Sequence, residues 1–125
     1  MASKQEILRK AAEKIIDLDP KMRFVGMVNL KGNIVEGIMK KGKTSLESQK
    51  EDEHFCMQVA ERRKMREEFD KQLGKVRYVH VERENVTMLV VYTKKYTILV
   101  TVEPELDIKK KMLIVNSIKK TASKL

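Results

Sequence analysis

The chain of 125 residues has one cysteine, two prolines, no tryptophan and only three phenylalanines and three tyrosines. A single cysteine cannot form an intramolecular disulfide, so nothing indicates a disulfide-stabilised secreted protein. With so few aromatic residues, most of them at core-like positions, sequence-specific binding of single-stranded nucleic acid is disfavoured, because such binding uses exposed aromatic side chains for stacking. The longest apolar run, residues 88–92, is far too short to cross a bilayer. The first ten residues carry charges and no apolar signal-peptide core. We therefore expect a cytoplasmic protein without membrane insertion.

Charged side chains are abundant and mostly basic. Lysine and arginine total 27 against 18 aspartates and glutamates, which gives a net charge of +9. The apolar share of 42% is enough for one hydrophobic core, so we expect a single domain spanning residues 1–125. The excess of positive charge favours acidic partners, namely nucleic acid, an anionic membrane surface or an acidic protein face, without choosing among them.

The first forty residues predict a helix followed by a β-hairpin. Ser3 and Glu6 have the spacing of a capping box, and apolar residues at helical spacing predict a helix over 3–17 that ends before Pro20. From residue 22 the period changes to two, which predicts a strand to residue 30. Lys31-Gly32-Asn33 then predicts a turn, and 34–39 a second strand.

The rest of the chain predicts a long helix, three strands and a last helix. A second capping box at Ser48 opens a charged helix over 48–73, which ends at Gly74. Strands follow at 75–83, 86–93 and 96–103, and a helix at 105–122 comes after Pro104. Residues 86–92 are apolar on both faces, which is typical of an inner strand, whereas 75–83 is polar at several positions and suits an edge. The predicted fold class is α+β: one five-stranded antiparallel sheet between helices, in the order α-β-β-α-β-β-β-α, with one helix on one face and two on the other.

This order of elements resembles the roadblock, or dynein-light-chain-like, domain of the wider profilin-like group. The first hairpin, with Phe24-Val25-Gly26 in its first strand, Gly32 in the turn and Gly37 in its second strand, strengthens the likeness. Through that hairpin and the stretch 62–69, the chain is also similar to an archaeal roadblock-like family of unassigned function. The resemblance implies a scaffold that dimerises through its long middle helix and third strand, that has no catalytic residues, and whose relatives include regulators of small GTPases.

The middle helix carries a mixed stripe. At about 100° per residue, Phe55, Val59 and Phe69 share one face, and Arg62 and Arg66 fall within it. Two arginines cannot be buried there unpaired. Either their stems cover the sheet while their heads reach water, or a second chain supplies acceptors. Together with the edge-like third strand, this stripe gives a candidate dimer interface made of Phe55, Val59, Arg62, Arg66, Phe69, Val79 and Val81.

The last helix separates apolar residues from lysines. Its predicted apolar side consists of Ile108, Met112, Val115, Ile118 and Ala122. Its opposite side, taken with the loop after the first hairpin, gives a candidate anion or partner patch of Lys40, Lys41, Lys43, Lys109, Lys110, Lys120 and Lys124. The alternative is that these lysines are simply solvated.

Two local patterns suggest chemistry that the rest of the sequence does not support. His54 and Cys56 lie two apart on a helix with only one other histidine in the chain, too few groups for zinc or a catalytic thiol, so we expect a buried free thiol beside Phe55. Residues 37–44 match the phosphate-loop pattern G-x-x-x-x-G-K-T. They belong to a hairpin, however, and the next helix starts several residues later, so we expect a basic loop with solvated lysines. No catalytic, metal or cofactor site is predicted.

The leading hypothesis is a non-catalytic, homodimeric interaction or scaffold module whose further partner is a small GTPase or another acidic protein. The alternative is a basic accessory protein that binds nucleic acid. An enzyme is the third possibility, with the 37–44 pattern as its only support.

Overall fold

The computed structural model describes residues 3–125 and contains the predicted elements in the predicted order. They are α1 (Lys4–Ile16), β1 (Met22–Asn29), β2 (Ile34–Met39), α2 (Gln49–Glu67), α3 (Asp70–Leu73), β3 (Val79–Glu82), β4 (Thr87–Tyr92), β5 (Tyr96–Val102) and α4 (Ile108–Ala122). All neighbouring strands are antiparallel, and the sheet runs β2-β1-β5-β4-β3. The α+β class and the edge position of the third strand are thus confirmed.

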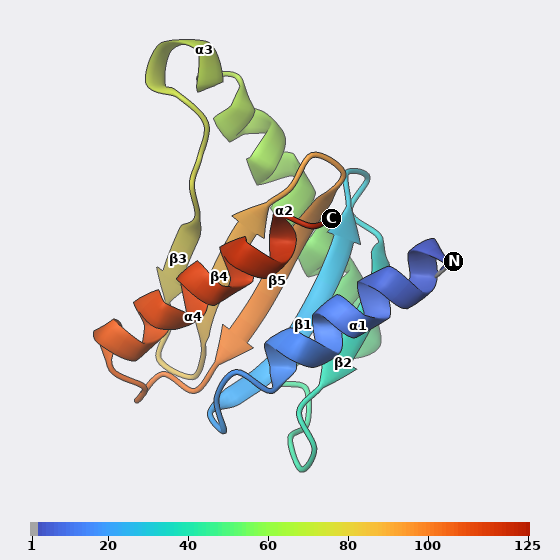
Figure 1. The fold of residues 1–125 in the computed structure, drawn as a ribbon, viewed down its shortest axis with the longest axis vertical. Coiled ribbons are helices and arrows are strands. Elements are labelled where there is room, and N and C mark those ends of the chain that lie inside the picture. The colour runs from blue at the N-terminus through green and yellow to red at the C-terminus, as the bar shows by residue number, and fades with distance from the viewer. Residues whose placement is uncertain (1–2) are drawn as a thin grey trace.

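The two faces of the sheet are covered unequally. Helices α1 and α4 pack side by side on one face, and α2 crosses the other (Figure 1). The larger hydrophobic core lies under α1 and α4, where Ile15, Met27, Leu89, Ile98 and Ile118 are fully buried. This confirms the expected division of one helix against two.

The face under α2 holds a much smaller core. It consists of Val28, Cys56, Met88, Val90 and Leu99, so the predicted burial of the cysteine is confirmed.

The turn between β1 and β2 packs closely against α2. Gly32 in that turn has φ of +93°, and a Cβ atom there would lie 2.8 Å from the Cα atom of Met57. Both the positive φ and the close approach require glycine at this position.

The long middle helix is shorter than predicted. It ends at Glu67 instead of Leu73, and a one-turn helix, α3, follows a break at Glu68 and Phe69. None of the α3 residues is buried. Because most helical stability in proteins comes from packing, a segment that has left the sheet has little to keep it straight. Gly74, with φ of +84°, ends α3 as expected.

Two further boundaries differ from the prediction. The third strand covers Val79–Glu82 and not 75–83, because the preceding residues descend from α3 without a strand partner. Helix α4 begins at Ile108 instead of residue 105, since the Asp107 side chain caps it by accepting from the Lys110 amide at 2.8 Å. Ile108 is 59% exposed, so its assignment to the apolar side was wrong. Lys111 and Ile114 take part in the buried side instead.

Candidate functional site

Residues 64–78 project beyond the sheet and are called the arm here. They comprise the end of α2, all of α3 and the extended segment that returns to β3 (Figure 1). Met65, Phe69, Leu73 and Tyr78 in the arm are all exposed, Leu73 by 80%. Several exposed apolar side chains in one projecting segment are typical of an interaction surface.

The arm starts where Arg63 fixes α2 to the β4–β5 hairpin. The Arg63 side chain is buried, and its guanidinium donates to the carbonyl oxygens of Tyr96 and Thr93 and to the Thr97 hydroxyl, at 2.5–3.0 Å. It also lies 4.6 Å from the centre of the Tyr92 ring. These three uncharged acceptors, the Glu67 carboxylate at 3.2 Å from Nε and the aromatic face satisfy the charge within the chain, so Arg63 anchors the helix just before the arm.

The buried side of α2 is rotated about a quarter turn from the predicted stripe. It consists of Cys56, Val59, Ala60 and Arg63. Arg62, one of the two arginines of the predicted mixed stripe, is exposed.

The other predicted interface residues of α2 divide between core and surface. The Val59 side chain is buried in the core of the chain and is not available to a partner. Phe55 is half-buried. Arg66 is also half-buried and donates to the Tyr92 hydroxyl at 2.9 Å. Phe69 is 55% exposed and lies between α2 and α3.

Strand β3 is the free edge of the sheet beside the arm. In the described part of the chain it pairs with β4 alone, through Val79↔Val90 to Glu82↔Thr87. Val79 and Val81 are half-buried on the α2 face, against the smaller core. The outer side of β3 therefore offers unpaired backbone groups next to apolar side chains.

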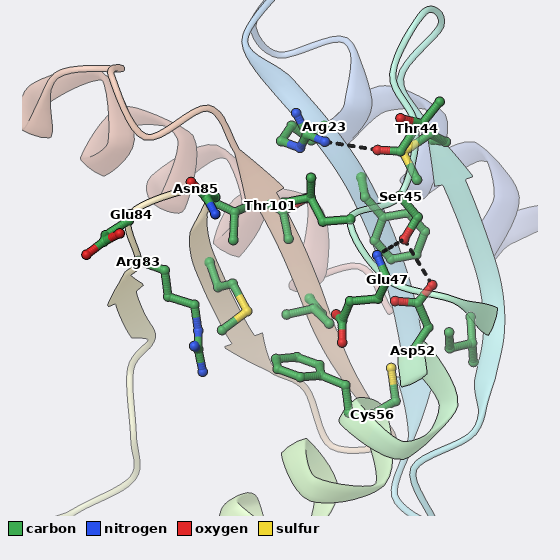
Figure 2. A pocket seen from close by; sticks show the side chains of 18 of the residues that line it. Arg23, Thr44, Ser45, Glu47, Asp52, Cys56, Arg83, Glu84, Asn85 and Thr101 are labelled. Carbon is green, nitrogen blue, oxygen red and sulfur yellow. Dashed lines mark hydrogen bonds between the residues drawn. The ribbon is translucent and has the colours of Figure 1, made fainter. Parts of the chain in front are cut away.

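A cavity of about 700 Å³ opens on the α2 face, at the end away from the arm (Figure 2). Its apolar lining includes Phe24, Phe55, Met88 and Leu99. The loop before α2 forms one wall, where the Ser45 hydroxyl donates to the Asp52 carboxylate and accepts from the Glu47 amide, both at 3.2 Å.

Opposing charges face each other across this cavity. Glu47 and Asp52 come from the loop and the start of α2, and Arg83 comes from the β3–β4 hairpin opposite (Figure 2). Burial, followed by the charges of Asp52 and Glu51, raises the pKa of Glu47, and Arg83 partly offsets this. Burial also raises the pKa of the Cys56 thiol to about 11, helped by Asp52 and Glu47. The thiol is therefore protonated at neutral pH and is a poor nucleophile.

The predicted basic patch is divided among separate parts of the molecule. The loop with Lys40, Lys41 and Lys43 lies at the opposite end of the sheet from the end of α4 that carries Lys120 and Lys124 (Figure 1). Lys109 and Lys110 lie at the start of α4.

Two of the three lysines of the first loop, Lys40 and Lys43, are not simply solvated, which differs from the expectation, whereas Lys41 is exposed. The Lys40 ammonium donates to the Ile16 carbonyl at 3.2 Å, and the Lys43 ammonium pairs with Glu103 at 2.8 Å. The phosphate-loop pattern contains these residues, but Gly37 lies in an antiparallel strand and α2 starts at Gln49. The pattern therefore lacks the strand–loop–helix geometry that holds phosphate.

The sequence-based reasoning missed two buried basic residues, Arg63 and Lys111. Arg63 follows Cys56, Val59 and Ala60 at spacings of seven, four and three, and this helical periodicity was the available signal. Lys111 pairs with Glu82 of β3 at 2.5 Å and donates to the Pro104 carbonyl at 3.0 Å. No pattern within α4 identifies that partner, which lies 29 residues away along the chain.

Within residues 3–125 there is no group of three or more histidine, cysteine, aspartate or glutamate side chains able to hold a metal ion. None of the helices described in this range is both long enough and apolar enough to span a membrane.

The fold defines a roadblock-like domain, and comparisons with solved structures agree. The gliding protein MglB from Thermus thermophilus is 10% identical, with a TM-score of 0.75 over 100% of this chain and 96% of that one. A structure described as MglB with a tetrameric arrangement is 10% identical, with a TM-score of 0.72 over 99% and 94% of the two chains. A roadblock/LC7 domain from Streptomyces avermitilis is 13% identical, with a TM-score of 0.58 over 89% and 93%.

Sequence comparison assigns the family. The chain belongs to the family described as a family of unknown function (DUF6659), whose model matches residues 4–124. Comparison with curated proteins found no match.

Proposed function

We propose that this chain is a non-catalytic cytoplasmic module that forms a homodimer through the arm and β3, and that the dimer regulates a small GTPase. The observation that carries the dimer is the position of an apolar arm directly beside a free sheet edge. Phe69 and Leu73 are exposed in the arm, and Val79 begins β3, whose outer edge is unpaired. A two-fold axis at β3 uses this patch twice, pairs the free backbone groups and covers the apolar side chains.

Arg62 and Arg66 have different roles in the proposed dimer interface. Arg66 is held by the Tyr92 hydroxyl, so it shapes the surface beside β3. Arg62 is exposed one turn earlier on α2 and is free to meet acceptors of the second chain. Phe55 and Val81 border the same surface from the core side. The tetrameric arrangement named for MglB supports self-association of this fold.

The oligomeric state in solution tests the dimer. We expect light scattering at micromolar concentration to give twice the chain mass of 14.6 kDa. The double variant Phe69→Asp with Leu73→Asp removes apolar burial of about 1.5–3 kcal/mol per side chain in each of the two chains, so the Kd rises at least about ten-thousandfold. Leu113→Asp is the matched control, because Leu113 is 65% exposed on the other face. A wild-type mass of one chain, or equal loss of dimer in both variants, contradicts the proposal. Circular dichroism checks that each variant is folded.

The small-GTPase part of the proposal rests on the roadblock class of the fold. The wild-type dimer and the arm double variant are compared as bait for the small GTPases of the same cell, loaded with GDP or with a non-hydrolysable GTP analogue. We expect the wild-type dimer, and not the arm double variant, to retain a GTPase in one nucleotide state. When that GTPase is purified and mixed with the dimer, we expect its rate of GTP hydrolysis or nucleotide exchange to change. Absence of both effects removes this function while leaving the dimer intact.

A further inference from the structure

The outward side of α4 carries lysines and no carboxylate. Lys109, Lys110, Lys120 and Lys124 are exposed, and within the described residues none of them forms an ion pair. The nearest acidic residue in the sequence, Asp107, is the N-cap of the helix.

The two remaining lysines of α4 are used inside the fold. Lys111 is buried and pairs with Glu82, and the Lys119 ammonium lies 5.1 Å from the centre of the Tyr78 ring. The four exposed lysines therefore form a separate group, with no role in holding the chain together.

An exposed leucine lies in the middle of this lysine surface. Lys109, Leu113, Asn116 and Lys120 follow one another at steps of four, three and four, which aligns them along one side of the helix, and Lys124 lies in the turn just after the helix ends. Leu113 is 65% exposed. We call these five residues and Lys110 the lysine row.

The neighbouring helix in the same layer has a different surface. On the outward side of α1, Lys10 and Lys14 alternate with Glu6, Glu13 and Asp17, and all five are exposed. The potentials of opposite charges side by side largely cancel at a distance, whereas the potentials of the like charges in the lysine row add. The unbalanced positive charge of this layer is thus concentrated along α4.

We propose that the lysine row binds the surface of an anionic lipid bilayer. Such a surface supplies phosphate and carboxylate groups for the ammonium groups and, just beneath them, an apolar layer for Leu113. Duplex nucleic acid also supplies phosphates, but it has no comparable layer for an aliphatic side chain. The row lies on the face opposite α2 (Figure 1). Binding therefore requires neither the arm nor the proposed dimer.

Vesicle flotation at low ionic strength tests this surface, with phosphatidylcholine vesicles that contain or lack phosphatidylserine. We expect the full chain to float only with phosphatidylserine and to be released by salt, because screening shortens the reach of surface charges. Each lysine near such a surface contributes about a fivefold change in affinity. The first variant removes the charges of the row through Lys109→Gln, Lys110→Gln, Lys120→Gln and Lys124→Gln. It should therefore bind phosphatidylserine vesicles at least about a hundredfold more weakly than the wild type.

A second variant separates the row from net charge. It removes the same number of exposed lysines elsewhere, through Lys10→Gln, Lys14→Gln, Lys94→Gln and Lys95→Gln. We expect it to keep most of its vesicle binding. Leu113→Asn should weaken vesicle binding several-fold and leave any binding of duplex DNA unchanged.

Three results overturn the proposal. The first is flotation that does not depend on phosphatidylserine, or no flotation at all. The second is equal loss of binding in the two four-lysine variants, which makes the effect one of total charge. The third is vesicle binding that is indifferent to Leu113→Asn and weaker than binding of duplex DNA, which assigns the row to nucleic acid. Light scattering on the same protein preparations without vesicles reports the dimer separately, so neither proposal depends on the outcome of the other.

Discussion

Replacing Arg63 with methionine tests whether one buried guanidinium holds α2 on the sheet. Methionine keeps much of the side-chain volume and leaves no buried unpaired charge. The Tyr96 carbonyl oxygen still accepts from the amide and hydroxyl of Thr93, at 2.8 and 3.1 Å. The Thr93 carbonyl oxygen, in contrast, loses the donor that Arg63 provides at 2.5 Å.

The size of the effect follows from these contacts. An acceptor such as the part-buried Thr93 carbonyl, left without its donor, costs about 1–3 kcal/mol, toward the lower end where water can reach it, and loss of the cation–π contact costs about 0.5–2 kcal/mol. We therefore expect Arg63→Met to lower the free energy of unfolding by about 2–4 kcal/mol. Arg63→Lys should lose most of the same amount, because an ammonium cannot reproduce the planar fork that reaches four acceptors.

Arg62→Met is the matched control, since its side chain is exposed one residue earlier on the same helix. We expect a change within about 0.5 kcal/mol for this variant. Equilibrium unfolding in urea, followed by circular dichroism at one low protein concentration, measures all three variants. Equal effects of Arg63→Met and Arg62→Met, both below about 1 kcal/mol, would refute the assignment of Arg63 as an anchor.

Three other measurements follow from single sites. The Lys111 ammonium, followed by the His80 ring, lowers the pKa of Glu82 to about 2. The stability that this carboxylate contributes is therefore complete above the unfolded pKa and is lost as the pH falls from about 4.5 to 2. Glu82→Gln should make the free energy of unfolding depend less on pH in that range, and a pH dependence equal to that of the wild type contradicts the pairing. Burial and a pKa of about 11 should make the native Cys56 thiol react with a disulfide reagent far more slowly than in denaturant, and equal rates contradict its burial. Gly32→Ala should destabilise the chain more than Gly42→Ala, because both have positive φ but only at Gly32 would the new methyl group meet backbone of α2; equal losses in thermal unfolding argue against that close approach.

The sheet was predictable because its signals are local. Alternation along residues 22–30, the Gly32 turn and the apolar run at 88–92 each identify a strand or hairpin without reference to distant residues. The edge position of β3 followed in the same way from its polar residues.

The buried side of α2 was not predictable by the same means. Its core is small, and one quarter of the buried residues on the helix is an arginine. A helix face chosen by its apolar residues therefore included Phe69 and pointed toward Leu73, and both side chains are exposed in the arm. The groups that bury Arg63 are backbone carbonyls of a hairpin 30 to 33 residues further along the chain, and the identity of side chains does not show where a carbonyl oxygen will be free.

The unequal cores on the two faces of the sheet have a consequence for local unfolding. Elements with few buried apolar contacts open at lower free energy than the whole protein, and hydrogen exchange of their amides is correspondingly faster. The amides of α2 should therefore exchange faster than those of α1 and α4. Within α2, the amides in the arm should exchange faster than those before Arg63, which the hydrogen bonds of Arg63 hold on the sheet. A second chain or a partner that covers α2 slows that exchange by its own binding energy. Of the three long helices, the one with the smallest core beneath it is thus also the one in which the arrival of a partner can be measured most directly.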